Sequence, residues 1–274
     1  MRSDFSEILL DTDILQRAAV KLDEKLCRNP EDVESMTSLG EIYRKLGMLE
    51  KAAEMYGKIC NVTTDNRKAK YLQTLLAGEH LALWPDDEKF IPPQFTQIKN
   101  YLSATTHEEL LSFVSGIESE FNPSTVLSGY YPEVSKSFVY YFRNEFYEAL
   151  REQLVACLPT ICERLQIKLF SHGYISLEIK AYRHSDYFRP HSDRYTGGNR
   201  RINFGCVFYF TPKRFSGGDF LLFDTDFEGQ NFLPTRFTRF IPEDNCAIFY
   251  PSDSYHSVTP VKTQGLNLKT VVLQ

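Results

Sequence analysis

The sequence lacks several features that would place it in a common class of protein. None of its six cysteines lies in a Cys-x-x-Cys pair, and most stand in apolar patterns such as INFGCVFYF and NCAIFY, so we expect buried thiols rather than metal ligands or disulfides. No run approaches the roughly 20 apolar residues of a membrane helix. The start, MRSDFSEILLDTDILQ, is acidic and lacks the basic and apolar segments of a signal peptide. We therefore expect a cytoplasmic protein with reduced thiols and no membrane partner.

Positive charge is also scarce. The chain has 31 Lys and Arg residues against 36 Asp and Glu residues, which gives a formal net charge of -5. Nucleic acids bind surfaces whose basic residues displace counterions from phosphates, so we expect no nucleic-acid partner. With 42% hydrophobic residues over 274 positions, the chain can bury a full core and fits either one large domain or one large domain with a small appendage.

Residues 11 to about 83, within a predicted first domain of residues 1–83, show the periodicity of helices. Apolar residues recur three and four positions apart in LQRAAVKLDEKLCRNP, EDVESMTSLGEIYRKLGMLEKAAEMYGKIC and NRKAKYLQTLLAGEHLALW. The middle segment resembles a tetratricopeptide repeat, in which small residues such as Gly40 let two antiparallel helices approach and residues such as Tyr43 and Tyr56 fill the seam. We predict a small all-α tetratricopeptide-like domain, with a generic helical cap as the alternative. Its concave face would bind a peptide, mediate protein–protein contact such as dimerisation, or brace the second half.

The composition changes at residues 84–94, WPDDEKFIPPQ, which we interpret as a linker to a second domain at residues 95–274. Two helical segments follow, THEELLSFVSGIESEF and FRNEFYEALREQLVACLPTICERLQI. From about residue 168 the apolar pattern alternates, in GYISLEIKAY, RINFGCVFYFTP, GDFLLFD, CAIFYP, HSVTPV and LNLKTVVL. Strands separated by Gly, Pro and Asp turns predict an α+β domain built on an antiparallel double-stranded β-helix, or jelly roll, with supporting helices.

Three residues of this half form a candidate metal site. His191 and Asp193 stand two positions apart in DYFRPHSDRYTGG, and His256 begins a predicted strand in FYPSDSYHSVTPV. Two imidazoles and one carboxylate are the ligand set of many non-haem Fe(II) sites, where three further metal positions stay open. We predict that these three residues bind the metal and carry catalysis.

The ordered segments AYRHSDYFRPHSD, RRINFGCVFYF, FSGGDFLLF and PEDNCAIFYPSDSYHSVTPV resemble the 2-oxoglutarate-dependent oxygenases of the prolyl 4-hydroxylase type over residues 95–274. The resemblance implies that His191, Asp193 and His256 bind Fe(II), which 2-oxoglutarate chelates and at which O2 is consumed, with ascorbate left open as a further reductant. It also implies hydroxylation of a C–H bond in a peptide, protein or amino-acid substrate, with release of succinate and CO2. Because Asp193 fills the third protein position and leaves no vacancy for a halide, hydroxylation is favoured over halogenation.

The chain departs from that family at the cation for the distal carboxylate of 2-oxoglutarate. The family places an Arg or Lys nine or ten residues after the second histidine, where this chain has Gly265 and Leu266. Our first candidate is Lys269 in the last strand, and the second is Lys262 in the preceding turn. The alternative for Lys269 is a solvent-facing charge near the end of an edge strand.

Other residues have two interpretations each. Tyr182 and Tyr209 match family positions that contact the cosubstrate, although either can be a core tyrosine whose hydroxyl bonds the backbone, and Phe208 can replace Tyr209 at the inward position. Of Arg200 and Arg201, we expect one to form an ion pair and the other to meet the substrate. The remaining positions are expected to lie outside the site: an exposed His184, the non-ligand residues His80, His107 and His172, and a turn at Gly217 and Gly218.

Two rival functions remain at this level. One is a non-catalytic scaffold in which the tetratricopeptide-like helices bind peptides and the jelly roll is degenerate; the missing basic residue is its support. The other is a metal-dependent jelly-roll enzyme that does not use 2-oxoglutarate. Formation of succinate on turnover would separate both from the oxygenase.

Overall fold

The computed structural model describes residues 12–78, 83, 85, 88–126, 129–141, 145–171, 175–193, 203–211, 215–226, 229–263 and 270–273, the last four for their backbone. The chain forms two compact units, residues 1–94 with 221–240 and residues 95–220 with 241–274. The first unit thus combines the N-terminal helices with a later segment that the sequence did not associate with them. Among the described residues, no helix is both long and apolar enough to cross a membrane.

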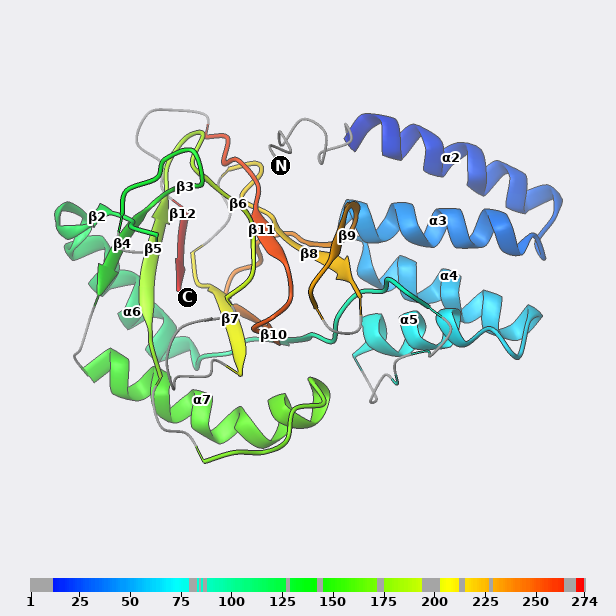
Figure 1. Ribbon diagram of the computed structural model, residues 1–274. Helices are drawn as coiled ribbons and strands as arrows, with labels where there is room; N and C mark the ends of the chain where they lie inside the picture. Colours follow the sequence, from blue (N-terminus) through cyan, green and yellow to red (C-terminus); the bar gives the residue numbers. More distant parts are fainter. Residues whose placement is uncertain are drawn as a thin grey trace. The chain divides into compact units, whose positions relative to one another are not determined.

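The first unit contains a stack of helices (Figure 1): α2 Thr12–Arg28, α3 Val33–Leu46, α4 Leu49–Val62 and α5 Arg67–Ala77. Each helix packs against the next along the chain. Capping residues set the ends of α3, because the Asp32 side chain accepts a hydrogen bond from the Ser35 backbone N–H and Gly47 adopts the left-handed conformation at φ 75°. The N-terminal helical region is therefore present as predicted.

Gly40 allows α3 and α4 to approach closely. A Cβ atom at residue 40 would lie 2.9 Å from Cζ of Tyr56, which is too close for any larger side chain without a shift. Tyr56 is buried against this glycine, and Tyr43 is also buried, which agrees with the small and large residues expected from the sequence. The assignment of these helices to the tetratricopeptide class stays a prediction.

Strands β8 Phe220–Thr225 and β9 Phe232–Phe240 lie largely in the first unit. Helix α3 packs on β9, and Ile91 and Thr225 exchange backbone hydrogen bonds of 3.1 and 3.0 Å. The sequence did not predict β9, since Pro234 and two arginines interrupt the apolar alternation of FLPTRFTRF.

The second unit is built on a seven-stranded antiparallel sheet with the order β1-β10-β7-β12-β5-β4-β2. Its strands are β1 Thr96–Lys99, β2 Asn122–Pro123, β4 Phe138–Tyr141, β5 Glu178–Tyr182, β7 Phe204–Tyr209, β10 Cys246–Pro251 and β12 Thr270–Leu273. The unit also contains a row of three short strands in the order β3-β6-β11, namely β3 Ser135–Lys136, β6 Tyr187–His191 and β11 His256–Val258.

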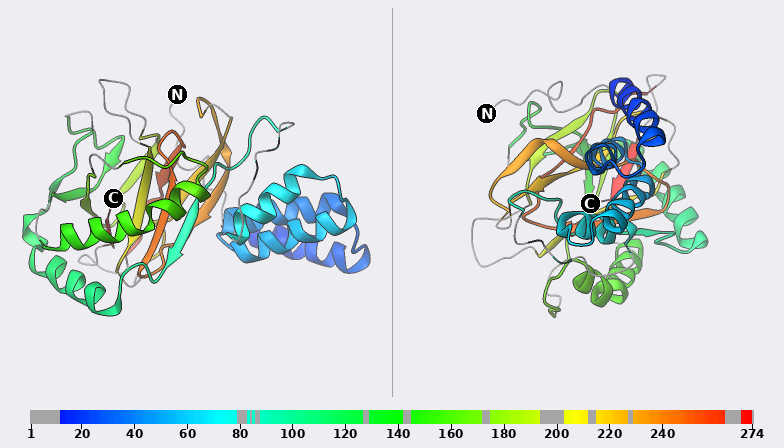
Figure 2. Two further views of the ribbon diagram at one scale, coloured as in Figure 1. Left: turned by 90° about the horizontal axis from the view of Figure 1, so that it is seen from below. Right: turned by 90° about the vertical axis from the view of Figure 1, so that its right-hand side faces the viewer.

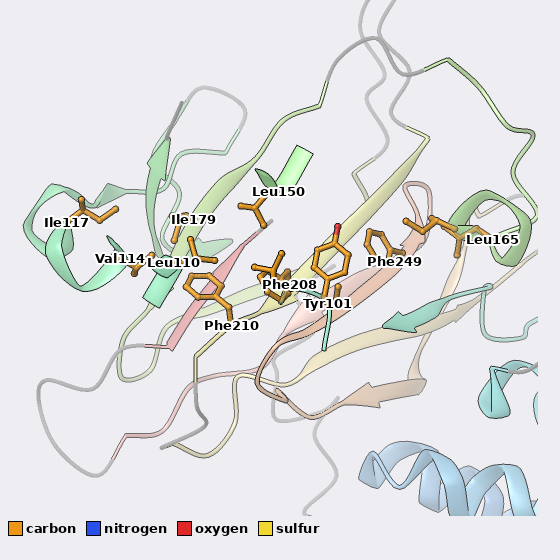
Figure 3. Close-up of a cluster of buried hydrophobic side chains, with 13 residues drawn as sticks. Tyr101, Leu110, Val114, Ile117, Leu150, Leu165, Ile179, Phe208, Phe210 and Phe249 are labelled. Carbon is orange, nitrogen blue, oxygen red and sulfur yellow. The ribbon is translucent and has the colours of Figure 1, made fainter. Parts of the chain in front are cut away.

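Two helices cover one face of the seven-stranded sheet: α6 Ala104–Gly116 and α7 Glu145–Arg164, with a 3-10 turn at Glu118–Glu120 (Figure 2). Apolar side chains of the sheet, including Ile179, Phe208 and Phe249, pack there against Leu110 and Leu150 of the helices (Figure 3). Successive side chains on a strand point to opposite faces, so this core assigns one face of the sheet to the helices. The other face is left for polar and aromatic side chains.

The antiparallel sheets with their covering helices, after an N-terminal helical region, confirm the predicted α+β class and the jelly-roll type of the second domain. The turn predicted at Gly217 and Gly218 is present, with φ angles of 70° and 66°. A Cβ atom at residue 217 would lie 2.0 Å from the carbonyl oxygen of Pro260, so only glycine fits there.

Candidate metal and cosubstrate site

Two histidines face each other across a pair of strands. His191 is the last residue of β6 and His256 the first residue of β11, and the antiparallel pairing places them directly opposite. Their ring centroids are 4.2 Å apart. The register of these two strands thus brings together two histidines that are 65 positions apart in the sequence.

Asp193 completes the cluster from the segment just after β6. Its Oδ1 atom lies 3.8 Å from Nε2 of His191 and 3.7 Å from Nε2 of His256. One ligand atom from each of the three residues lies within 4.8 Å of the other two. The structure therefore brings together all three residues that the sequence predicted as metal ligands.

Backbone carbonyl groups set the orientation of both imidazole rings. His191 Nδ1 lies 2.8 Å from the carbonyl oxygen of Arg189, and His256 Nδ1 lies 3.0 Å from that of Ser254. A carbonyl oxygen only accepts, so each Nδ1–H donates, and in the neutral form of each ring the lone pair is then on Nε2. Both lone pairs belong to the nitrogens that face Asp193, as a metal requires.

The site is closed on one side and open on the other. The side chain of His256 is fully buried, whereas those of His191 and Asp193 are 20% and 32% exposed. Phe188 stacks on the His191 ring with centroids 3.6 Å apart. Burial lowers the pKa of His191 well below its usual value, and the neighbouring His256 is the second largest cause. The low pKa keeps this imidazole neutral and able to bind a metal.

These donors fit a ferrous ion. Two neutral imidazoles and one carboxylate bind a divalent cation through mixed nitrogen and oxygen ligands, and a set of three leaves positions for further ligands. The partial exposure of His191 and Asp193 gives such ligands an approach. A backbone carbonyl also accepts a hydrogen bond from each ring, which holds the imidazoles in a fixed orientation.

Tyr182 lies on the sheet face opposite the helices. Its hydroxyl is buried without a well-formed hydrogen bond to the described residues. Burial raises the pKa of Tyr182, and the nearby Ser137 hydroxyl lowers it only in part. A buried polar atom without a good partner costs free energy, so this hydroxyl fits a polar ligand such as the predicted dicarboxylate cosubstrate.

Tyr209 is equally buried, but its hydroxyl donates a hydrogen bond of 3.3 Å to the carbonyl oxygen of Gly218. This is the backbone-bonded arrangement that we gave as the alternative for both tyrosines. Its neighbour Phe208 points into the core beneath the helices, so Tyr209 holds the inward position. A cosubstrate contact of Tyr209 stays a prediction.

The two candidate lysines differ in what the structure describes. Lys262 is exposed, and its backbone pairs with Ser216. Lys269 lies outside the described residues, as do the other predicted positions Arg200, Arg201, His80 and His172.

The two remaining histidines lie apart from the cluster, as the sequence indicated. His184 is exposed and accepts a 3.2 Å hydrogen bond from the Thr263 backbone N–H. His107 is buried with Nε2 2.8 Å from the carbonyl oxygen of Phe210.

The sequence did not single out two residues next to the cluster. The Tyr250 hydroxyl lies 3.2 Å from Oδ2 of Asp193, and burial followed by Asp193 raises the pKa of Tyr250 well above its usual value. Lys180, two positions before Tyr182, has its Nζ 5.1 Å from the ring centroid of Phe188. The period of two along a strand could have indicated Lys180, because residues 180 and 182 share a face.

Comparison with known proteins agrees with this geometry. Residues 177–273 match the family model of the 2OG-Fe(II) oxygenase superfamily. An uncharacterized PKHD-type hydroxylase of Synechocystis sp. is 28% identical over 204 residues, which cover 71% of this chain and 66% of that relative. The match therefore spans just under two thirds of the relative's length.

Two solved structures are similar to the chain. A Pseudomonas putida prolyl-4-hydroxylase has a TM-score of 0.49 and 18% identity over 65% of this chain and 89% of its own. A Trichoplax adhaerens prolyl hydroxylase, in complex with a peptide fragment of hypoxia inducible factor, has a TM-score of 0.49 and 15% identity over 65% and 81%. From the family match and the ligand cluster within it, we conclude that the chain carries a 2OG-Fe(II) oxygenase domain.

Proposed function

We propose that this protein is a dioxygenase that uses Fe(II), 2-oxoglutarate and O2 to hydroxylate a C–H bond in a peptide, protein or amino-acid substrate, with release of succinate and CO2. The observation that carries the proposal is the convergence of two oriented Nε2 atoms and one Asp193 oxygen beside a partly exposed approach. The chemistry supplied by bound iron and 2-oxoglutarate is activation of O2 for oxidation of a C–H bond.

The protein's own residues orient the metal ligands and surround them with apolar side chains. His191 and His256 would each bind the metal through Nε2, and a backbone carbonyl that accepts from Nδ1 fixes the direction of each ring. The rings of Phe188 and Phe220 lie against these imidazoles, with centroid distances of 3.6 and 5.4 Å. Apolar rings on this side exclude water from the ligand atoms and strengthen their interaction with a cation.

Turnover of 2-oxoglutarate is the direct test. The Fe(II)-loaded protein should convert 2-oxoglutarate and O2 into succinate, and a matching peptide or amino acid should gain the mass of one oxygen atom. We would screen peptides and free amino acids for stimulated succinate formation and measure product mass. If no succinate forms under any condition, the metal-bound scaffold or the enzyme without 2-oxoglutarate replaces this proposal.

Within this function, we assign the cation for the distal carboxylate of 2-oxoglutarate to Lys180. Strand register places Lys180, Tyr182 and Tyr209 on one face, because Lys180 and Tyr209 both oppose residue 272 of β12. Only 12% of the Lys180 side chain is exposed. Its charge also contributes to the low pKa of His191, after burial and His256.

Lys180 forms an ion pair of 2.9 Å with Glu178, whose side chain is 23% exposed. An incoming carboxylate would share the ammonium group with Glu178, since a lysine has three donors. The buried hydroxyl of Tyr182, two residues further along the same face, would donate to the same ligand. Lys180 and Tyr182 would together give the distal carboxylate a cation and a hydroxyl donor. They would replace the basic residue that is missing after His256.

We expect Lys180→Met to raise the Kd for 2-oxoglutarate by about tenfold or more, because a hydrogen bond to a charged group contributes about 1.5–3 kcal/mol. Calorimetry on protein loaded with Zn(II) would measure this without turnover. The matched control is Lys262→Met, which removes an exposed lysine and should leave the Kd unchanged. A loss on Lys269→Met but not on Lys180→Met would return the role to the residue predicted from the sequence.

A further inference from the structure

Tyr250 is a buried polar residue beside the ligand cluster, and the proposed chemistry assigns it no role. It lies near the end of β10 and is 1% exposed. Its hydroxyl is 3.2 Å from Oδ2 of Asp193 and 3.4 Å from Nε2 of His256. A hydroxyl that contacts two ligand side chains affects their orientation and their affinity for a metal.

The two oxygens of Asp193 have different surroundings. Oδ1 faces Nε2 of both histidines, at 3.8 and 3.7 Å. Oδ2 accepts the hydrogen bond from Tyr250. Carboxylates bind metals through one oxygen or through both, and the bond to Tyr250 occupies the oxygen that two-oxygen binding would need.

The surroundings of Tyr250 hold the hydroxyl at this place. Gly205 opposes Tyr250 in the pairing of β7 and β10, and a Cβ atom at residue 205 would lie 2.6 to 2.7 Å from atoms of the tyrosine ring. Glycine is therefore the residue that leaves room for the ring. On other sides the ring meets Phe220 and His256, with centroid distances of 5.0 and 4.7 Å.

We propose that Tyr250 is a positioning residue that holds Asp193 in one-oxygen ligation, so that a further metal position stays available to 2-oxoglutarate or O2. The availability of that position matters only if the proposed function holds, but the effect on metal ligation does not depend on turnover. The hydroxyl acts through Asp193, and it need not touch the substrate.

The test is Tyr250→Phe, which removes the hydroxyl and keeps the aromatic ring that packs over Gly205. We expect the Kd for Co(II) to rise by about 10- to 100-fold, the usual loss for an outer-shell partner of a metal ligand. The visible absorption spectrum of the bound Co(II) should also change, because an uncapped carboxylate can bind through both oxygens. A merely structural role for Tyr250 would not alter the spectrum.

The matched control is Tyr71→Phe in the other compact unit. Tyr71 is 2% exposed and donates a 2.6 Å hydrogen bond to the carbonyl oxygen of Pro92, so this variant also loses one buried hydroxyl. It should keep the Co(II) affinity and spectrum of the unmodified protein. The proposal is wrong if the Co(II) affinity or the Co(II) spectrum of Tyr250→Phe matches that of the control.

Gly205→Ala provides a second variant that keeps the hydroxyl but displaces the ring. It should weaken Co(II) binding in the same direction, and adding it to Tyr250→Phe should change the Kd little further. If the loss of Co(II) binding free energy in the double variant equals the sum of the two single losses, Gly205 does not act by positioning the Tyr250 hydroxyl. Unmodified protein that binds Co(II) but forms no succinate with iron would refute the proposed function, whereas an inert Tyr250→Phe in a protein that does form succinate would refute this inference alone.

Discussion

Asp193→Ala should abolish succinate formation and lower the affinity for Fe(II) by more than about 100-fold, beyond the loss of about 10- to 100-fold typical of an outer-shell partner. The physical reason is charge, because Asp193 brings the one negative charge of the three ligands, and a histidine binds a metal through an uncharged imidazole. Asp193 is 32% exposed, so its removal leaves no buried cavity. Metal binding by calorimetry and succinate formation by mass spectrometry would measure the two effects on one sample.

His191→Ala and His256→Ala should have the same outcome, since each removes one of the three converging ligand atoms. The matched control is His184→Ala. His184 precedes His191 by seven positions but is exposed and bonds Thr263, so its removal should leave metal binding intact. Normal turnover in any of the three ligand variants would refute the site.

The ligand cluster could be predicted because each of its residues stands in a recognisable local sequence pattern. His191 and Asp193 are two positions apart, and His256 starts a strand with a clear alternating pattern. The sequence could not give the register that sets His191 directly opposite His256. Register depends on how the strands pack, which a single sequence read without homologues leaves undetermined.

The residues around the cluster were harder to predict for physical reasons. Lys180 reads as a surface charge until its face is known, and Tyr250 reads as a core aromatic in CAIFYP. The role proposed for each depends on a neighbour from another strand, Phe188 of β6 for Lys180 and Gly205 of β7 for Tyr250. By contrast, the backbone bond of Tyr209 was one of the two arrangements already weighed.

A buried cluster of charges in the first unit was not predictable at all. Arg44 of α3 and Asp224 of β8 are 180 positions apart, yet Arg44 Nη2 lies 2.7 Å from Asp224 Oδ1 and both side chains are fully buried. Arg236 of β9 approaches the other oxygen of Asp224 at 3.0 Å, and Glu41 lies 3.3 Å from Arg44. Arginine on an amphipathic helix normally indicates an exposed face, which is why the pattern misleads here.

Asp224→Ala should therefore lower the free energy of unfolding by about 3–5 kcal/mol, the usual cost of removing one partner of a buried ion pair. The loss arises because the buried Arg44 and the nearby Arg236 would be left with Glu41 as the one anion of the cluster that they share. Denaturant unfolding would measure it. The control is Glu54→Ala, which breaks an exposed pair with Lys58 and should change stability little.

Removing both buried charges should recover much of that stability. In Arg44→Met with Asp224→Leu, no uncompensated charge remains between these two positions, and Glu41 and Arg236 stay as a balanced pair. If the double variant is as unstable as Asp224→Ala, the loss comes from packing and the electrostatic explanation is wrong. If Asp224→Ala is as stable as Glu54→Ala, the cluster contributes nothing.

The same cluster bears on the role of the N-terminal helices. Deletion of residues 1–83 removes Arg44 and Glu41 and uncovers the face of β9 on which α3 packs, so the truncated chain should be insoluble or lose all activity together. That outcome indicates a bracing role for the helices. A soluble truncation that still forms succinate from 2-oxoglutarate but no longer hydroxylates a peptide would indicate recruitment instead, because remote contacts then supply the binding energy that positions the substrate. The buried charges favour bracing: a module that only recruits substrate has no physical need for an ion pair fully enclosed between its helix and a strand 180 positions away.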